Sequence, residues 1–199
     1  MNKFLLKIFF AVAVLTAVNA HAQNWDINLL KSINSQSSNG GAWVAVTKST
    51  YPVAVAVPVG TFAVGYFSKN KLLQKKAIDI AGSLVINVAI TQSLKYIINR
   101  QRPYQKYPGE VFPYQYDTDP SFPSGHTSTA FATATSLSLN CKKWYVVAPA
   151  FVWATAVGYS RLHMGEHYPS DVLMGAVIGA GSAWLSHWLT EKYFAKHKF

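Results

Sequence analysis

Five apolar stretches recur along the chain, and short polar segments separate them. They cover residues 51–67, 77–98, 124–139, 144–159 and 172–189. Each comes close to the roughly 17–25 residues that a helix needs to cross a bilayer, although the third and fourth are short. Because Ser, Thr, Gly and Ala are frequent in them, a soluble helical bundle is an open alternative. The pattern predicts an all-α fold, with residues 24–50 as an amphipathic lead-in.

The first 22 residues predict a secretory signal peptide. Lys3 and Lys7 form a positive start, an apolar run follows at residues 8–18, and Ala20 and Ala22 frame a small-residue cleavage site. The alternative is an uncleaved first membrane helix, which would make six helices rather than five. In either case we expect residues 23–199 to form a single domain that begins on the far side of the inner membrane.

The distribution of positive charge indicates a membrane topology. The chain has 18 Lys and Arg against 8 Asp and Glu. Alternate threading from an exported N-terminus places residues 68–76, 142–143 and 191–199 in the cytoplasm, and these three segments hold nine lysines. Short cytoplasmic loops of membrane proteins are enriched in Lys and Arg, whereas a soluble bundle has no reason to sort its lysines in this way. We therefore expect a membrane-embedded bundle of five to six helices.

Composition narrows the function classes further. The chain contains 11 Tyr, 11 Phe and 6 Trp, which suits a membrane interface better than a nucleic-acid-binding surface. The single Cys141 excludes an internal disulfide framework and a cysteine-based zinc site. Gly175 and Gly179 have the spacing that allows two helix backbones to approach closely in lipid.

Three polar clusters fall on the outer, periplasmic side of this topology. The first contains Lys95 and Arg102, followed by Pro103. Seven positions are about two helical turns, so the two cations share a helix face if the helix continues that far. Positive residues on the outer side need a reason other than topology, and an anionic ligand supplies one.

The second cluster is Ser124-Gly125-His126, where a proline-rich loop turns into an apolar helix. A helix N-terminus offers free N–H groups and the positive end of its dipole, which suits a phosphate. As an isolated tripeptide, the pattern favours a capping serine followed by a surface histidine over a phosphate site.

The third cluster contains Arg161, His167 and Asp171. His167 and Asp171 are four positions apart, so the carboxylate can orient the imidazole and leave its other nitrogen free as a base or nucleophile. The guanidinium of Arg161 suits phosphate oxygens. His163 to His167 also matches the zinc-binding pattern His-x-x-Glu-His, but Gly165 and Pro169 argue against the continuous helix that this pattern needs. We expect no metal and no other cofactor.

Together the clusters resemble the three signature motifs of the phosphatidic acid phosphatase type 2 / haloperoxidase superfamily. They appear here as Lys-x6-Arg-Pro, Pro-Ser-Gly-His and Ser-Arg-x5-His-x3-Asp, complete and in order over residues 95–171. The resemblance implies that His167 attacks phosphorus to form a phosphohistidine, that Asp171 orients it, and that His126 protonates the leaving oxygen. The phosphate-binding residues that it implies are Lys95, Arg102, Ser124, Gly125 and Arg161.

The resulting hypothesis is a metal-independent membrane phosphatase whose active site faces the periplasm. Candidate substrates are undecaprenyl pyrophosphate, phosphatidylglycerophosphate, phosphatidic acid and the phosphates of lipid A. The proline- and tyrosine-rich loop at residues 103–123 either guides the lipid headgroup or is a rigid rim without ligand contact. Three alternatives stay open: a soluble periplasmic acid phosphatase of the same superfamily, a vanadate-dependent haloperoxidase, and a non-catalytic bundle that binds lipid phosphate.

Overall fold

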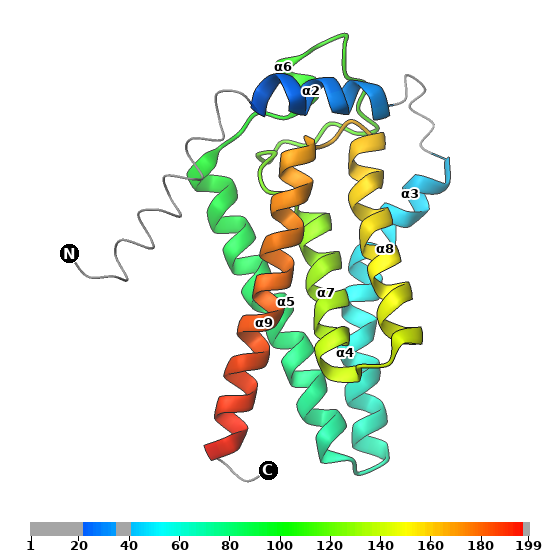
Figure 1. The fold of residues 1–199 in the computed structure, drawn as a ribbon, viewed down its shortest axis with the longest axis vertical. Coiled ribbons are helices and arrows are strands. Elements are labelled where there is room, and N and C mark those ends of the chain that lie inside the picture. The colour runs from blue at the N-terminus through cyan, green and yellow to red at the C-terminus, as the bar shows by residue number, and fades with distance from the viewer. Residues whose placement is uncertain (1–21, 35–40, 197–199) are drawn as a thin grey trace, which may run out of the picture.

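The computed structural model of the protein describes residues 22–34 and 41–196, and within these ranges the chain is helical with no strand. Five helices coincide with the five predicted apolar stretches, which confirms the predicted all-α fold (Figure 1). The predicted signal segment lies outside the described residues, apart from Ala22. The helices are α2 (Ala22–Ile33), α3 (Gly41–Lys48), α4 (Thr50–Phe67), α5 (Lys71–Ile98), α6 (Pro103–Lys106), α7 (Gly125–Cys141), α8 (Trp144–His163) and α9 (Pro169–Lys196).

Helix α7 is the most enclosed helix and packs closely against α9. Its buried positions from Thr127 to Ser136 are all Ala, Ser or Thr, which keeps the helix slim. A methyl group added at Gly179 would lie 2.1 Å from the carbonyl oxygen of Ser128, and one at Gly175 would lie 2.7 Å from that of Ser124. The predicted close approach at these two glycines is therefore confirmed, because any side chain there would push α9 away from α7.

Within the described ranges, three helical segments are long and apolar enough to cross a membrane: Gly41–Phe67, Lys71–Lys106 and Pro169–Phe194. Their outward faces carry large apolar side chains, such as the exposed Phe67 and Trp184. Helix α7 has only 17 residues and lies inside the bundle, so its surface does not need to match lipid. The protein is a membrane protein, as the hydropathy pattern predicted.

The two ends of the bundle carry different segments (Figure 1). The α4–α5 turn, the α7–α8 turn and the C-terminal end of α9 lie together at what we call the lysine end. The C-terminal end of α5, the N-terminal end of α7 and the α8–α9 connection lie together at the opposite end, which we call the site end. This is the alternation that the lysine distribution predicted.

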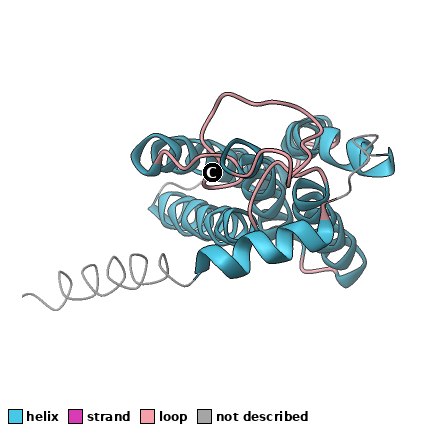
Figure 2. Cartoon of the chain, turned by 90° about the horizontal axis from the view of Figure 1, so that it is seen from above, coloured by secondary structure: helices cyan, strands magenta, loops and turns pink. Residues whose placement is uncertain are grey.

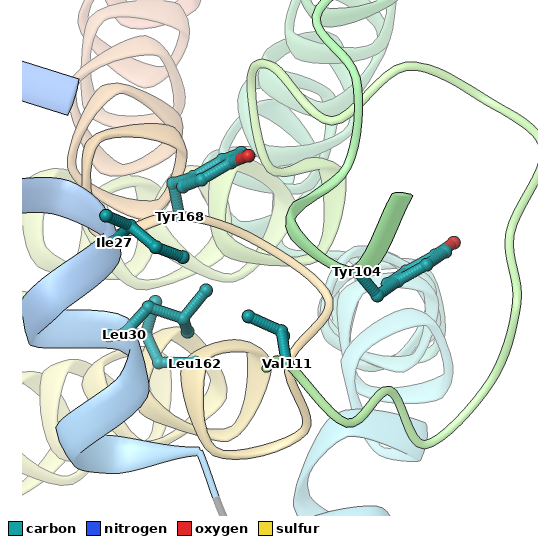
Figure 3. Packing of buried hydrophobic residues seen from close by; sticks show 6 residues of the cluster. All are labelled: Ile27, Leu30, Tyr104, Val111, Leu162 and Tyr168. Carbon is teal, nitrogen blue, oxygen red and sulfur yellow. The ribbon is translucent and has the colours of Figure 1, made fainter. Parts of the chain in front are cut away.

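Helix α2 lies across the site end (Figures 1 and 2). It buries Ile27 and Leu30 against Leu162 of α8 and Tyr168 of the α8–α9 connection (Figure 3). Trp25 on its other face is exposed. The expected amphipathic lead-in is thus a helix that covers the end of the bundle where the motifs meet.

Candidate active site

Three buried cations converge at the site end from three separate segments. Lys95 lies on the last turn of α5, Arg102 precedes α6, and Arg161 lies on the last turn of α8; none of them is more than 4% exposed. The expectation that Lys95 and Arg102 share one helix face is wrong. Helix α5 ends at Ile98, where Asn99 adopts a left-handed conformation with φ 47°, and Arg102 is extended. The turn in the chain, rather than helical periodicity, brings the two side chains together.

Three carboxylates that sequence reasoning did not single out as site residues face these cations. Asp119 lies 2.8 Å from the Nζ of Lys95 and 2.6 Å from an Nη of Arg102. Asp117 lies 3.1 Å and Glu166 3.5 Å from the other Nη of Arg102. A site that holds three positive charges in a buried place needs nearby negative charge, because isolated buried charges are very costly. A phosphate that binds to the cations therefore competes with these carboxylates.

Two of these carboxyl groups have strongly shifted pKa values. Burial alone would raise the pKa of Asp119, but its hydrogen bonds and charge interactions with Lys95 and Arg102 lower it to about 2. Burial raises the pKa of Glu166 to about 7, against the opposing effect of Arg161. Asp119 is thus firmly ionised at neutral pH, whereas Glu166 titrates there.

Arg161 retains unused hydrogen-bond donors. Its Nη1 donates to the Oγ1 of Thr47 over 3.1 Å. Among the residues that the structure describes, its buried Nε and Nη2 atoms find no acceptor within hydrogen-bond distance. The nearest carboxylate oxygens, on Glu166 and Asp117, lie 3.7 and 3.9 Å from Nη2. Buried donors are nearly always paired in proteins, so two free N–H groups on one guanidinium mark a place for an anion.

The second motif forms the start of α7, as its sequence predicted. Ser124 is fully buried and caps the helix, because its Oγ accepts a hydrogen bond from the backbone N–H of Thr127. The backbone N–H of Ser124 donates to the carbonyl oxygen of Asp171 over 3.1 Å, which ties this helix start to α9. His126 follows in the first turn, and its ring centroid lies 4.8 Å from the ring centroid of Tyr51 on α4. Gly125 exposes the first turn of the helix, since only the Tyr51 hydroxyl comes near its missing side chain.

The third motif brings His167 and Asp171 together across the start of α9. The Nδ1 of His167 lies 3.6 Å from the Oδ2 of Asp171 and 3.5 Å from the Oγ of Ser121. The first distance is longer than a hydrogen bond. Burial lowers the pKa of His167 to about 4, against the opposing interaction with the Asp171 carboxylate. His167 is therefore neutral at pH 7, and its Nε2 is available as a nucleophile when Nδ1 faces the carboxylate.

The zinc-like pattern His-x-x-Glu-His does not lie on one helix. Helix α8 ends at His163, and Gly165 reverses the chain in a left-handed conformation with φ 66°. A Cβ atom added at Gly165 would lie 2.7 Å from the carbonyl oxygen of Phe112, so no larger residue fits there. The Glu166 carboxylate instead accepts a hydrogen bond from the backbone N–H of Gln115 over 2.9 Å.

The proline-rich loop contributes residues both to the core and to the surface. Tyr104 is buried, and its hydroxyl exchanges hydrogen bonds with the backbone of Asp117. Tyr116 is 80% exposed, although its ring packs edge-on against Tyr104. Thus one tyrosine holds the loop that carries Asp117, and another is placed at the surface where a lipid could touch it.

Known proteins are similar to this chain in fold and in sequence. Residues 76–195 match the PAP2 superfamily. The undecaprenyl-diphosphatase of Sulfolobus acidocaldarius is 27% identical over 92% of this chain and 87% of its own length. The lipid A 1-phosphatase of Porphyromonas gingivalis is 32% identical over 65% of this chain and 27% of its own length. The crystal structure of a transmembrane PAP2 type phosphatidylglycerolphosphate phosphatase from Bacillus subtilis has a TM-score of 0.71 at 23% identity, over 96% of this chain and 98% of that one. The predicted family and class of enzyme are confirmed, while the phosphohistidine and the role of each residue stay predictions.

Proposed function

Because the chain belongs to the PAP2 superfamily, we propose that it hydrolyses lipid phosphates or pyrophosphates through a phosphohistidine intermediate. The observation that carries the proposal is the pair of free, buried N–H donors on Arg161 beside the buried cations Lys95 and Arg102. Phosphoryl transfer depends mainly on positioning and on neutralising the charge of the equatorial oxygens. Three fixed cations can do both without a metal ion.

In the proposed binding mode, Lys95, Arg102 and Arg161 hold the phosphoryl oxygens. The amide of Gly125 and the capped start of α7 add N–H donors on the same group. Ser124 then acts mainly by holding that helix start, because its Oγ is engaged with Thr127.

The proposed chemistry has two steps. In the first, the Nε2 of His167 attacks phosphorus, the P–O bond to the lipid breaks, and His126 gives a proton to the leaving oxygen. Burial and the charge of Arg161 lower the pKa of His126 to about 3, so His126 acquires this proton only when the negative charge of the bound phosphate raises its pKa. In the second, His126 takes a proton from water, the water oxygen attacks phosphorus, and the P–N bond breaks to release phosphate. Asp171 stabilises the positive charge that develops on His167 during the first step. The low pKa of about 4 for His167 supports this role, because the nucleophile must be neutral.

A lipid is the proposed source of the phosphate. The site lies at one end of membrane-spanning helices, and the exposed Tyr116 is placed on the loop above it. The relatives' names include an undecaprenyl-diphosphatase and a lipid A 1-phosphatase. A phosphate group attached to a membrane anchor is the chemistry that these substrates share.

A direct test is phosphate release by detergent-purified protein in EDTA. The substrates are undecaprenyl pyrophosphate, phosphatidylglycerophosphate, phosphatidic acid and one soluble aryl phosphate. We expect the wild type to release phosphate from at least one lipid faster than from the aryl phosphate. We expect His167→Ala to lose about a thousandfold or more in kcat, since the nucleophile is gone. His187→Gln at the lysine end is the matched control and keeps wild-type turnover, because glutamine can still donate a hydrogen bond to Asp79.

Three outcomes contradict the proposal in different ways. Preference for the aryl phosphate would favour a small-molecule acid phosphatase. Binding of lipid phosphate without release would favour a non-catalytic bundle. Activity that EDTA abolishes would point to a metal-dependent reaction.

We further propose that the protein lies in a bacterial inner membrane with the site end in the periplasm. The lysines at the opposite end support this orientation through the positive-inside rule. Cys141, the last residue of α7, is the only cysteine of the sequence, and α7 ends at the lysine end. In intact spheroplasts we expect a membrane-impermeant maleimide to leave Cys141 unlabelled and to label Tyr116→Cys in a Cys141→Ser background. The reverse labelling pattern would place the site in the cytoplasm.

A further inference from the structure

Helix α2 places a buried carboxylate, Asp26, at the site end. Asp26 is 1% exposed, and both of its carboxylate oxygens are engaged. Its Oδ1 accepts a hydrogen bond of 2.8 Å from the backbone N–H of Ser170, and its Oδ2 accepts one from the Oγ of the same serine. The Oδ2 also lies 2.8 Å from an Nη of Arg100. A charged residue is rarely buried unless it is paired, so this one is held by a specific set of partners.

Arg100 connects Asp26 to Asp171. Its Nη2 binds Asp26, and its Nη1 binds the Oδ1 of Asp171 over 2.6 Å. The face of the guanidinium lies on the ring of Tyr168, 3.8 Å from the centroid. A planar group held by two carboxylates and one aromatic ring has little freedom to move.

The bridge fixes the side of Asp171 that faces away from His167. Arg100 binds Oδ1, whereas Oδ2 is the oxygen nearest to His167. Oδ2 also accepts hydrogen bonds from the Oγ of Ser121 and from the backbone N–H of Tyr168. With Oδ1 held by Arg100, rotation of the carboxylate away from His167 would break the salt bridge as well as these bonds.

We infer that Asp26 and Arg100 are positioning residues for the catalytic pair, so that α2 sets the orientation of Asp171 through Arg100. The inference rests on the proposed function of His167 and Asp171. Arg100 does not act as a further phosphate ligand, because its guanidinium is held between the buried Asp26 and Asp171 and its face is covered by the ring of Tyr168. Arg102 differs, since it pairs with the half-exposed Asp119. Asp26 acts mainly through Arg100, because its described polar contacts are with Arg100 and with Ser170, whose Oγ also accepts a hydrogen bond from the Nη1 of Arg100. Helix α2 is thus part of the catalytic apparatus, although it carries no residue of the three motifs.

The test is a double-mutant cycle in the purified full-length protein with the preferred lipid substrate. We expect Asp26→Asn to lower kcat about tenfold and Arg100→Gln about a hundredfold, with KM within about twofold of wild type, because misorientation of a reacting group affects the chemical step more than binding. Since Asp26 acts mainly through Arg100, the double variant should lie within about twofold of Arg100→Gln alone. Effects that multiply in the double variant would overturn the proposal.

A matched control distinguishes a loss of Asp171 orientation from a general loss of α2 packing on the bundle. Lys31 lies on the same helix and binds Glu110 of the proline-rich loop without contacting Arg100 or Asp171. If docking of α2 alone mattered, Lys31→Gln would lower kcat as much as Asp26→Asn does. We expect Lys31→Gln to keep wild-type kcat, and an equal loss in both variants would contradict the inference.

Arg100→Lys keeps the inference testable if Asp26→Asn does not fold. Lysine retains the positive charge, but a single ammonium group cannot reproduce the two-armed bridge, so we expect kcat to fall about tenfold at unchanged KM. Wild-type turnover in Arg100→Lys would overturn the inference while leaving the phosphatase proposal intact. Absence of turnover in the wild type itself would instead count against the proposed function.

Discussion

The two ends of the helix bundle both carry many charges but hold them in different ways. At the site end, Lys95, Arg102 and Arg161 are at most 4% exposed, and Arg161 keeps two free N–H groups among the described residues. At the lysine end, Lys75 pairs with Glu191 over 2.8 Å, with side chains that are 20% and 56% exposed. Exposed pairs contribute little to stability, whereas buried, incompletely paired charges are costly. The buried, incompletely paired charges lie where we propose that the protein binds a phosphate, and the exposed pair lies at the end that we propose faces the cytoplasm.

The largest expected effect breaks the site end. Arg161→Lys keeps the charge but loses the planar guanidinium. In the wild type its Nη1 binds Thr47, and its Nε and Nη2 are left to bind a ligand. We expect kcat/KM for the lipid substrate to fall by about two to three orders of magnitude, as for other losses of transition-state hydrogen bonds. The control Lys75→Ala at the lysine end should keep wild-type kcat/KM. An Arg161→Lys enzyme within threefold of wild type would mean that charge alone suffices there.

The second prediction concerns the buried carboxyl group of Glu166, which has a pKa of about 7. The pKa of this group is higher in the folded protein than in the unfolded chain, where it is near 4.5. The group therefore stabilises the fold fully below pH 4.5, and this contribution is lost as the pH rises through 7. Glu166→Gln removes this titration while retaining the acceptor for Gln115. From pH 5 to pH 8, we therefore expect the Tm of the variant to rise relative to wild type by about 5 °C, measured by thermal unfolding in detergent. Parallel Tm curves for the two proteins would show that Glu166 does not titrate in this range.

The third prediction concerns competition for the site cations. Asp119 binds Lys95 and Arg102, and its pKa of about 2 keeps it ionised. Asp119→Asn removes one negative charge from the place where phosphate oxygens are proposed to lie. We expect the inhibition constant of inorganic phosphate to fall about fivefold, corresponding to roughly 1 kcal/mol of lost repulsion. The control is Glu110→Gln, because Glu110 is an acidic residue of the same loop but pairs with Lys31. This variant should leave the inhibition constant unchanged. Weaker phosphate binding in Asp119→Asn would mean that Asp119 orients the cations instead.

The sequence predicted the helices well because their signal is local. Apolar stretches predicted five helices whose observed ends lie within about seven residues of the predicted ones. The spacing of Gly175 and Gly179 predicted a close backbone approach, which the structure makes with α7. The convergence of Lys95 and Arg102 was expected for the wrong reason, since Asn99 ends the helix between them.

What could not be predicted depends on contacts between distant parts of the chain. Asp26 and Arg100 are 74 positions apart, and nothing periodic in the sequence connects them. Asp117 and Asp119 lie in an irregular proline-rich loop, where neither helical nor strand periodicity tells which way a side chain points. The three motifs supplied the cations and histidines, but only the fold supplies the carboxylates that surround them.

The smallest expected effect is at the lysine end, and it tests the contrast between the exposed charges there and the buried charges of the site end. Glu191→Gln breaks the exposed pair with Lys75 and leaves the rest of the bundle untouched. Because such pairs are screened by solvent and salt, we expect Tm to change by less than about 2 °C and kcat to stay at the wild-type value. Raising the salt concentration should reduce even this small difference, since exposed charges are screened within about 10 Å at 0.1 M. A large loss of stability in Glu191→Gln would mean that the lysine end, too, relies on a pairing that the fold cannot do without, and that exposure does not separate the two ends.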